Sequence, residues 1–349
     1  MIVIRTDANA HIATGHLMRT LAVAKECRRL GTPVCFVFAD NESENLLKKL
    51  SPDWQDYQIK VLNSQYDDME AELNAFTHFL NRETPTAALI DSYFVTPAYL
   101  SELGKYTKIF YLDDLQVFDY PVDRMNNAAF TDPDSNGWQV TPGGVTVINY
   151  TLNPKLAPLR RQFRDIPYLV REKVSNILIT TGGTDEKDMT SKIMMAVESV
   201  GITVENAMTD PVSQHVVIGV LNCHREKLRA IAAENPRVIL YENHAEMAAL
   251  MQKCDLAISA AGSTLYELCA VGVPTICFTA ADNQMLNAKT LSANEMLIYV
   301  DDENFALHIS RIVADYAQRR KLSAKMRCLV DGYGAVRIAE ALAGLRRRA

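Results

Sequence analysis

Short apolar runs alternate with longer stretches of helical periodicity along the whole chain. In the first half, apolar runs predict strands, and the stretches between them predict helices. The predicted strands are residues 2–5, 33–38, 87–91, 108–112 and 146–149, and the predicted helices are residues 16–30, 42–50, 68–82 and 96–104. Alternation of this kind is typical of a parallel sheet with crossover helices.

A second series of the same kind begins at "NILITTGG". Its predicted strands are residues 176–181, 214–219, 236–241, 255–259 and 274–278, and its helices fall near 186–199, 223–234, 244–253 and 262–271. Between the two series, residues 151–170 hold three prolines and five charged side chains. We expect an α/β protein with two Rossmann-like domains, residues 1–155 and 171–349, joined by a linker at 156–170. The alternative for this stretch is an extra helix packed on the first domain.

Composition narrows the class of protein. The chain has 349 residues, a net charge of −6 and 48% hydrophobic residues, as an ordinary globular protein does. A mildly acidic chain without a basic stripe argues against nucleic acid as a partner, and no apolar run is long enough to predict a membrane span. The seven scattered cysteines lack a CxxC pair, which favours reduced thiols and a cytoplasmic location. No metal-ligand spacing is present, so we expect no metal.

The first candidate site follows the first strand, in "RTDANAHIATGHLMRT". Gly15 and His16 open the next helix, and Arg19 follows one turn later on about the same face. His16 can accept a proton from water if a carboxylate such as Asp7 orients its imidazole. The alternative is that His16 only caps the helix and Asp7 binds loop amides. Arg5, at the end of the strand, belongs to the same candidate site.

A second polar cluster, Asp91, Ser92 and Tyr93, ends the strand at 87–91. A buried strand that ends in an acid and a tyrosine suggests groups lining a ligand site. A plain turn at the strand end is equally consistent with the pattern.

The third candidate is "TTGGTDEKD" at 180–188. Gly182 and Gly183 allow backbone amides to approach an anion, and Thr184 offers a hydroxyl where the next helix is expected to start. The loop matches neither the P-loop nor GxGxxG. The alternative is a structural turn with Thr184 or Asp185 as the helix N-cap.

The fourth candidate, residues 256–288, holds two apolar strands, each of which ends in a polar loop before a helix. Gly262, Ser263 and Thr264 can hold a phosphate oxygen at a helix N-terminus, and Glu267 can accept hydrogen bonds from ribose hydroxyls. In the next loop, polar groups are offered to a sugar by Asp282, Asn283 and Gln284. Capping roles are the alternative for Ser263, Glu267 and Asp282. Two adjacent polar loops indicate one ligand lying across both.

Together these stretches resemble a known family over nearly the whole chain. The motifs are "IRTDANAHIATGHLMRTLAVA", "IDSY", "YLDD", "TTGGTD", "ISAAGSTLYELCAVGVPTICFTAADNQ" and "DGYGAVRI". They are similar to the hydrolases that act on UDP-2,4-diacetamido-2,4,6-trideoxy-β-L-altropyranose in pseudaminic acid biosynthesis. The C-terminal half also resembles the N-acetylglucosaminyltransferases of peptidoglycan synthesis. The chain departs from the hydrolase pattern at Ala13, where the family usually has glycine.

The resemblance implies a GT-B fold and release of UDP and the free sugar, with inversion and without metal or cofactor. The implied partners are therefore a small UDP-sugar substrate and the UDP product. By position, His16 would activate water, and Tyr93 and Asn283 would contact the sugar or position that water. Gly183 and Ser263 would lie near the pyrophosphate and Glu267 at the ribose.

Three other functions stay open at this point. The first is a glycosyltransferase of the same fold that uses a UDP-sugar donor. The second is a nucleotide-sugar sensor without turnover, and the third is an epimerase that hydrolyses UDP-N-acetylglucosamine.

Overall fold

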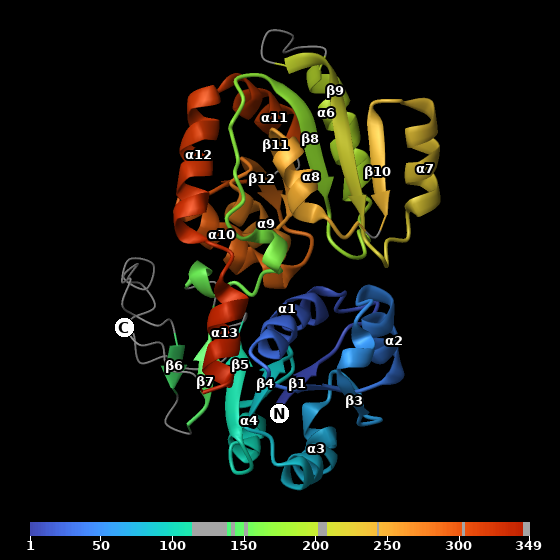
Figure 1. Ribbon diagram of the computed structural model, residues 1–349. Helices are drawn as coiled ribbons and strands as arrows, with labels where there is room; N and C mark the ends of the chain where they lie inside the picture. The colour runs from blue at the N-terminus through green and yellow to red at the C-terminus, as the bar shows by residue number, and fades with distance from the viewer. Residues whose placement is uncertain are drawn as a thin grey trace. The chain divides into compact units, whose positions relative to one another are not determined.

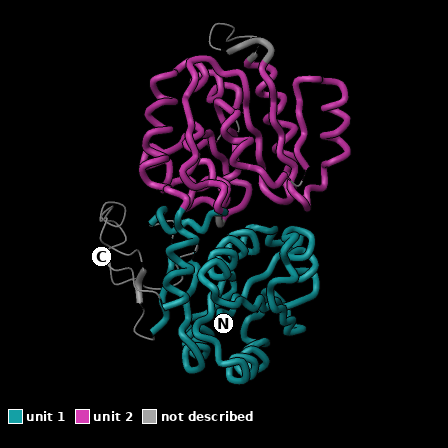
Figure 2. The backbone as a smooth tube through the Cα atoms, in the orientation of Figure 1, with its two compact units in different colours: residues 1–160, 333–349 teal, residues 161–332 magenta. Residues whose placement is uncertain are grey.

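The computed structural model describes residues 1–113, 138–140, 144–149, 153–201, 208–242, 244–301 and 304–344. Asp114, at the end of "YLDD", lies outside these residues. The chain forms two compact units (Figure 2): unit 1 is Met1–Arg160 with Tyr333–Ala349, and unit 2 is Arg161–Gly332.

Unit 1 contains a seven-stranded sheet in the order β3-β2-β1-β4-β5-β7-β6 (Figure 1). The strands are β1 (Ile2–Thr6), β2 (Val34–Phe38), β3 (Gln58–Val61), β4 (Ala87–Asp91), β5 (Lys108–Leu112), β6 (Trp138–Val140) and β7 (Thr146–Ile148). All neighbours pair in parallel except β6 and β7. The helices are α1 (Gly15–Arg29), α2 (Asn41–Leu50), α3 (Met69–Glu83), α4 (Pro97–Leu103) and α13 (Gly334–Leu342), with 3-10 turns η1 (Trp54–Asp56) and η2 (Pro154–Leu156).

Unit 2 contains a fully parallel six-stranded sheet in the order β10-β9-β8-β11-β12-β13. The strands are β8 (Val174–Thr180), β9 (Met208–Ile218), β10 (Val238–Glu242), β11 (Leu256–Ala260), β12 (Thr275–Phe278) and β13 (Ile298–Tyr299). The helices are α6 (Met189–Gly201), α7 (Arg225–Glu234), α8 (Met247–Lys253), α9 (Thr264–Val271), α10 (Met285–Ala293), α11 (Phe305–Ala314) and α12 (Tyr316–Leu329), with 3-10 turns η3 (Arg161–Phe163) and η4 (Asp282–Gln284).

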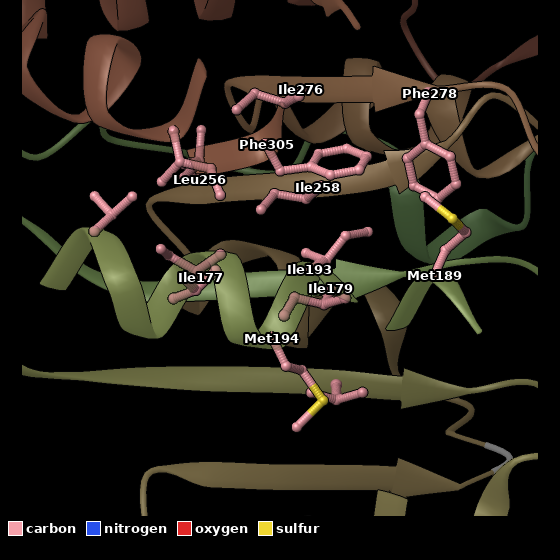
Figure 3. Packing of buried hydrophobic residues seen from close by; sticks show 14 of the residues in the cluster. Ile177, Ile179, Met189, Ile193, Met194, Leu256, Ile258, Ile276, Phe278 and Phe305 are labelled. Carbon is pink, nitrogen blue, oxygen red and sulfur yellow. The ribbon is translucent and has the colours of Figure 1, made fainter. Parts of the chain in front are cut away.

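Each unit has its own apolar core. In unit 2, branched side chains of β8, β11 and β12 pack with the inner face of α6 and with Phe305 of α11 (Figure 3). In unit 1, α3 and α4 cover a sheet face that includes Val3, Val37 and Ile90. Full burial of such side chains stabilises each unit by roughly 1.5–3 kcal/mol per residue before entropy is counted. The alternating pattern therefore predicted the presence of both sheets, but not their strands β3, β6 and β13.

The units divide differently from the expected domains at the C-terminal end of the chain. The expected second domain ran to residue 349, but α13 packs against α1 and β4 in unit 1. Its buried face is Ala335, Ile338, Ala339 and Leu342. Gly334 permits this return, because a Cβ there would lie 2.1 Å from the carbonyl oxygen of Ala157. The expected linker at 156–170 is likewise divided between the units, between residues 160 and 161.

Both sheets have their topological switch point beside their first strand. β1 lies between β2 and β4, and β8 lies between β9 and β11. In open α/β sheets, ligands bind beyond the carboxyl ends of the strands at such points. Among the described residues, no helix is long and apolar enough to cross a membrane.

Candidate active site

His16 sits in the first turn of α1, beside the carboxyl end of β4. β1 and β4 pair with Thr6 opposite Asp91, which brings the last residue of β4 next to the loop that leads into α1. The Nδ1 atom of His16 lies 2.6 Å from Oδ1 of Asp91. The helix N-cap is Thr14. His16 therefore does not cap the helix; it pairs with an acid from another strand.

Arg19 completes this cluster from the next turn of α1. Its Nε donates to Oδ2 of Asp91 at 2.6 Å, and its terminal nitrogen donates to Oδ1. Burial alone would raise the pKa of Asp91, but the charge of Arg19, the charge of His16 when its imidazole is protonated, and the hydrogen bonds from both outweigh burial and lower this pKa to about 2. Asp91 is therefore an anion at neutral pH.

The anionic Asp91 determines which nitrogen of His16 carries the proton. Nδ1 lies 2.6 Å from the Asp91 carboxylate, which only accepts, and 2.9 Å from a terminal nitrogen of Arg19, which only donates. We assign the proton to Nδ1 from the shorter contact, which leaves the lone pair of a neutral imidazole on Nε2. Nε2 is buried and has no hydrogen-bond partner among the described residues. The ring of Tyr93 lies edge-on to the imidazole, with 4.2 Å between centroids. The arrangement suits a general base oriented by a carboxylate.

Arg5 and Asp7 have a different role from the expected one. Arg5 is fully buried and binds Glu72 through two nitrogens, each 2.7 Å from a carboxylate oxygen, and it also pairs with Asp7. Oδ1 of Asp7 accepts from the amide of Ala39 at 2.8 Å. The expectation that Asp7 orients the imidazole is therefore wrong, and Asp91 does so. The buried ion pairs anchor the start of the loop that carries His16.

Glu72 was not singled out in the sequence, although a signal was present. It lies three residues after Met69 and four before Phe76, on the buried face of α3. An acid at a core position requires a partner, because an unpaired buried charge is strongly destabilising. Tyr99 adds a hydrogen bond to the same carboxylate at 2.7 Å.

In unit 2, the glycine pair follows β8 and is held against the loop after β9. Gly182 has φ of +91°, a conformation that favours glycine. A Cβ on Gly219 would lie 2.4 Å from the carbonyl oxygens of both Gly182 and Gly183, so Gly219 allows the two loops to touch. The amide of Leu221 donates to the carbonyl of Gly183 at 3.2 Å.

The helix after this loop starts later than expected. α6 begins at Met189, and the Asp185 carboxylate accepts from the amides of Met189 at 2.8 Å and Thr190 at 3.2 Å. Asp185 therefore occupies this helix N-terminus, and Thr184 lies in the preceding loop. Phosphate contacts from this stretch would have to come from the loop 182–184 rather than from the α6 N-terminus.

The loop after β11 leaves its helix N-terminus without a side-chain cap. Ser263 is the N-cap of α9 and makes no capping hydrogen bond, Thr264 is the first helical residue, and Glu267 lies in the first turn. Ser263 thus occupies the N-cap position, but its side chain does not cap the helix by a hydrogen bond, as the structural alternative required. Amides at a helix N-terminus attract anions, so α9 retains the property expected of a phosphate site.

The loop after β12 lies against the α9 loop. A Cβ on Gly262 would lie 3.9 Å from Nε2 of Gln284. Gln284 itself accepts a hydrogen bond from the amide of Ala280 at 2.9 Å, which fixes the loop. Asn283 lies in η4 with Asp282, but its side chain is outside the described part of the structure. The two loops expected to share a ligand are thus neighbours.

The described residues contain no group of acids, histidines and cysteines arranged to hold a metal ion. The expectation of a metal-independent site stays a prediction.

Comparisons with known proteins find similarity to one domain family and to two relatives. Residues 176–340 match the glycosyltransferase family 28 C-terminal domain. The spore coat polysaccharide biosynthesis protein SpsG of Bacillus subtilis is 31% identical over 185 residues, which is 51% of this chain and 52% of that protein. The match thus spans about half the length of that relative. An uncharacterized protein of Methanocaldococcus jannaschii is 23% identical over 89% of this chain and 64% of its own length.

Solved structures identify the architecture. The calicheamicin glycosyltransferase CalG4 aligns with a TM-score of 0.62 at 15% identity, over 99% of this chain and 97% of its own. UGT2 of Phytolacca americana, solved with UDP-2fluoro-glucose and pterostilbene, aligns with a TM-score of 0.60 at 13% identity, over 98% of each chain. The chain has the GT-B fold. This confirms the fold expected from the resemblance, while identities this low carry the fold alone.

Proposed function

We propose that this GT-B protein is an enzyme that transfers a glycosyl group from a nucleotide sugar to an acceptor hydroxyl. The observation that carries the proposal is the His16–Asp91 pair, which leaves the imidazole Nε2 without a partner among the described residues. The family 28 match over 176–340 supports a nucleotide-sugar donor. These comparisons favour a transferase over the hydrolase implied by the sequence resemblance.

The proposed reaction uses His16 as the base. Nε2 takes the proton of the acceptor hydroxyl as its oxygen attacks the anomeric carbon. The bond from that carbon to the diphosphate oxygen breaks, and its electron pair leaves on the diphosphate. Within unit 2, amides of the loop 182–184 and of the α9 N-terminus are the groups proposed to bind the diphosphate. Attack opposite the leaving group inverts the anomeric centre.

Hydrolysis is the second candidate, with water as the acceptor. The observation in its favour is the burial of the base: His16 is only 2% exposed, so a small acceptor reaches it most easily. The substrate for this candidate is UDP-2,4-diacetamido-2,4,6-trideoxy-β-L-altropyranose, as the motif resemblance implies.

Acceptor dependence separates the two candidates. The purified protein is incubated without metal with this UDP-sugar or with UDP-N-acetylglucosamine, in the presence and absence of methyl β-glucosaminide, and NMR follows UDP and the products. A transferase releases UDP and forms a disaccharide only when the acceptor is present. UDP release at the same rate without acceptor, with free inverted sugar as the product, would establish the hydrolase instead.

A further inference from the structure

Three aromatic side chains form a connected run on unit 1 that the residues described so far leave unexplained. The rings of His11 and Tyr66 are nearly parallel, with 6.3 Å between centroids and 8° between planes. Tyr66 also meets Phe94 edge-on, with 5.6 Å between centroids. Phe94 is 37% exposed, although it is a large apolar side chain. We call His11, Tyr66 and Phe94 the aromatic platform.

The platform belongs to the same sheet edge as His16. Its members come from the loops after β1, β3 and β4, whose strands run parallel in one sheet (Figure 1). Phe94 directly follows Tyr93, whose ring contacts the His16 imidazole. Phe94 of the platform is therefore the sequence neighbour of Tyr93, which packs on the proposed base His16.

Hydrogen bonds fix the three loops. The side chain of Asn9 accepts from the amides of His11 at 2.9 Å and Ile12 at 3.0 Å. The amide of Phe94 donates to the hydroxyl of Ser92 at 3.2 Å. The amide of Ser64 donates to the carbonyl of Ala39 at 2.9 Å. The planes of Tyr66 and Phe94 are 76° apart, so a ligand that stacks on one ring meets the edge of the other. Rings on loops held by hydrogen bonds lose little entropy when such a ligand binds.

The charges around the platform restrict the ligand. Residues 8–14, 62–68 and 92–96 contain no lysine or arginine, but they contain Asp67 and Asp68. Two further acids border them: Glu42 accepts from the amide of Ala10, and Glu70 accepts from the hydroxyl of Thr96. A phosphate or carboxylate placed here would be repelled, whereas a neutral or amino-bearing ligand would not.

We infer that the aromatic platform binds the acceptor, and that the acceptor is a sugar free of phosphate and carboxylate. The apolar C–H face of a pyranose packs on aromatic rings, and an amino substituent would gain from the nearby acids and ring faces. An acceptor held there presents a hydroxyl toward the His16 end of the platform. This inference rests on the proposed function and names its acceptor class.

The test uses the full chain and three probes: methyl β-glucopyranoside, methyl β-glucosaminide and geranyl phosphate. Saturation-transfer NMR and titration measure their binding to the wild type and to Tyr66→Ala, Phe94→Ala and Tyr106→Ala. Tyr106 is a matched control, because it is 40% exposed on unit 1 and lies outside the platform. Thermal unfolding of each variant checks that its fold is intact.

We expect the two glycosides to bind and geranyl phosphate not to bind. Each platform variant should weaken glycoside binding at least tenfold, and Tyr106→Ala should leave it unchanged. The inference is overturned if no glycoside binds, if binding survives in both platform variants, or if geranyl phosphate binds through Phe94.

Failure of the inference is distinguishable from failure of the proposed function. Glycoside binding that depends on Phe94, in a chain that never consumes a donor sugar, would refute the transferase and keep the sugar subsite. Transfer that depends on His16 but keeps the same acceptor KM in Phe94→Ala would refute the subsite and keep the transferase.

Discussion

His16 and Asp91 are 75 residues apart in the chain, yet Nδ1 of one lies 2.6 Å from Oδ1 of the other. The contact exists because β4 inserts beside β1, so that both carboxyl ends meet at one edge of the sheet. The same carboxylate binds Arg19 from α1. This cluster ties the proposed base to the core of unit 1.

Asp91→Asn should reduce turnover, and it should weaken the dependence of the free energy of unfolding on pH in acid. The pKa of Asp91 is about 2 in the folded chain, below its ordinary value of 3.8. The stability that this group contributes is therefore present above about pH 4 and is lost as the pH falls toward 2. Urea unfolding between pH 5 and pH 2.5 should show a decrease for the wild type that is smaller by roughly 2 kcal/mol in the variant. Parallel pH profiles would contradict this assignment.

Glu72→Gln should lower the free energy of unfolding of unit 1, although Glu72 is not one of the proposed ligand-binding residues. It leaves the buried Arg5 charge with a weaker partner, and breaking a buried ion pair costs about 3–5 kcal/mol. The matched control is Glu102→Gln, because the Glu102–Lys105 pair lies on the surface and such pairs contribute about 1 kcal/mol or less. Chemical denaturation measures both variants. If both variants lose the same unfolding free energy, the buried ion pairs of Arg5 do not stabilise unit 1 more than a surface pair does.

Ala13→Gly should stabilise the loop that leads to His16. Ala13 has φ of +57°, a left-handed conformation that costs an L-residue about 1 kcal/mol. Glycine removes that strain, so we expect a gain of roughly 0.5 kcal/mol in the free energy of unfolding after its larger unfolded-state entropy is counted. Ala10→Gly, in the same loop but without a positive φ, is the control and should give a small loss. A loss at position 13 as large as at position 10 would argue against strain.

Gly219→Ala should weaken nucleotide binding. The added Cβ would lie 2.4 Å from the carbonyl oxygens of Gly182 and Gly183 and would push that loop away from the loop after β9. Calorimetry with UDP should show at least a tenfold loss of affinity (about 1.4 kcal/mol). Met195→Ala on α6, where the side chain is 66% exposed, serves as the control in the same unit. Unchanged affinity in Gly219→Ala would remove the glycine loop from the proposed site.

Sequence pattern predicted the inner strands and the edge strand β10, but it missed the edge strands β3, β6 and β13. β4 is buried along its whole length and reads as an apolar run, "AALID". β3, "QIKV", lies at the sheet edge and is partly exposed. Its polar Gln58 and Lys60 interrupt the apolar run that would have predicted a strand. β13 spans only Ile298–Tyr299, which is too short to form a pattern.

The sequence singled out residues of the candidate site but not the pairs that they form. His16 and Asp91 were both singled out, because each lies where an apolar element meets a polar loop. Which acid meets His16 depends on the strand order, and β2 and β3 intervene in the chain between β1 and β4. Asp7 is closer in sequence, but Arg5 and the Ala39 amide bind it. Local sequence cannot reveal this, because the competing partners lie on other elements.

The role of His16 as the base is tested by measuring the turnover of His16→Ala together with its nucleotide affinity. UDP release from the donor sugar that the wild type consumes is followed by NMR, and UDP binding by calorimetry. We expect turnover to fall about 10²–10⁴-fold, the usual contribution of a general base, while the Kd for UDP stays unchanged. Wild-type turnover in this variant would contradict the assignment of His16 as the base and the reaction built on it.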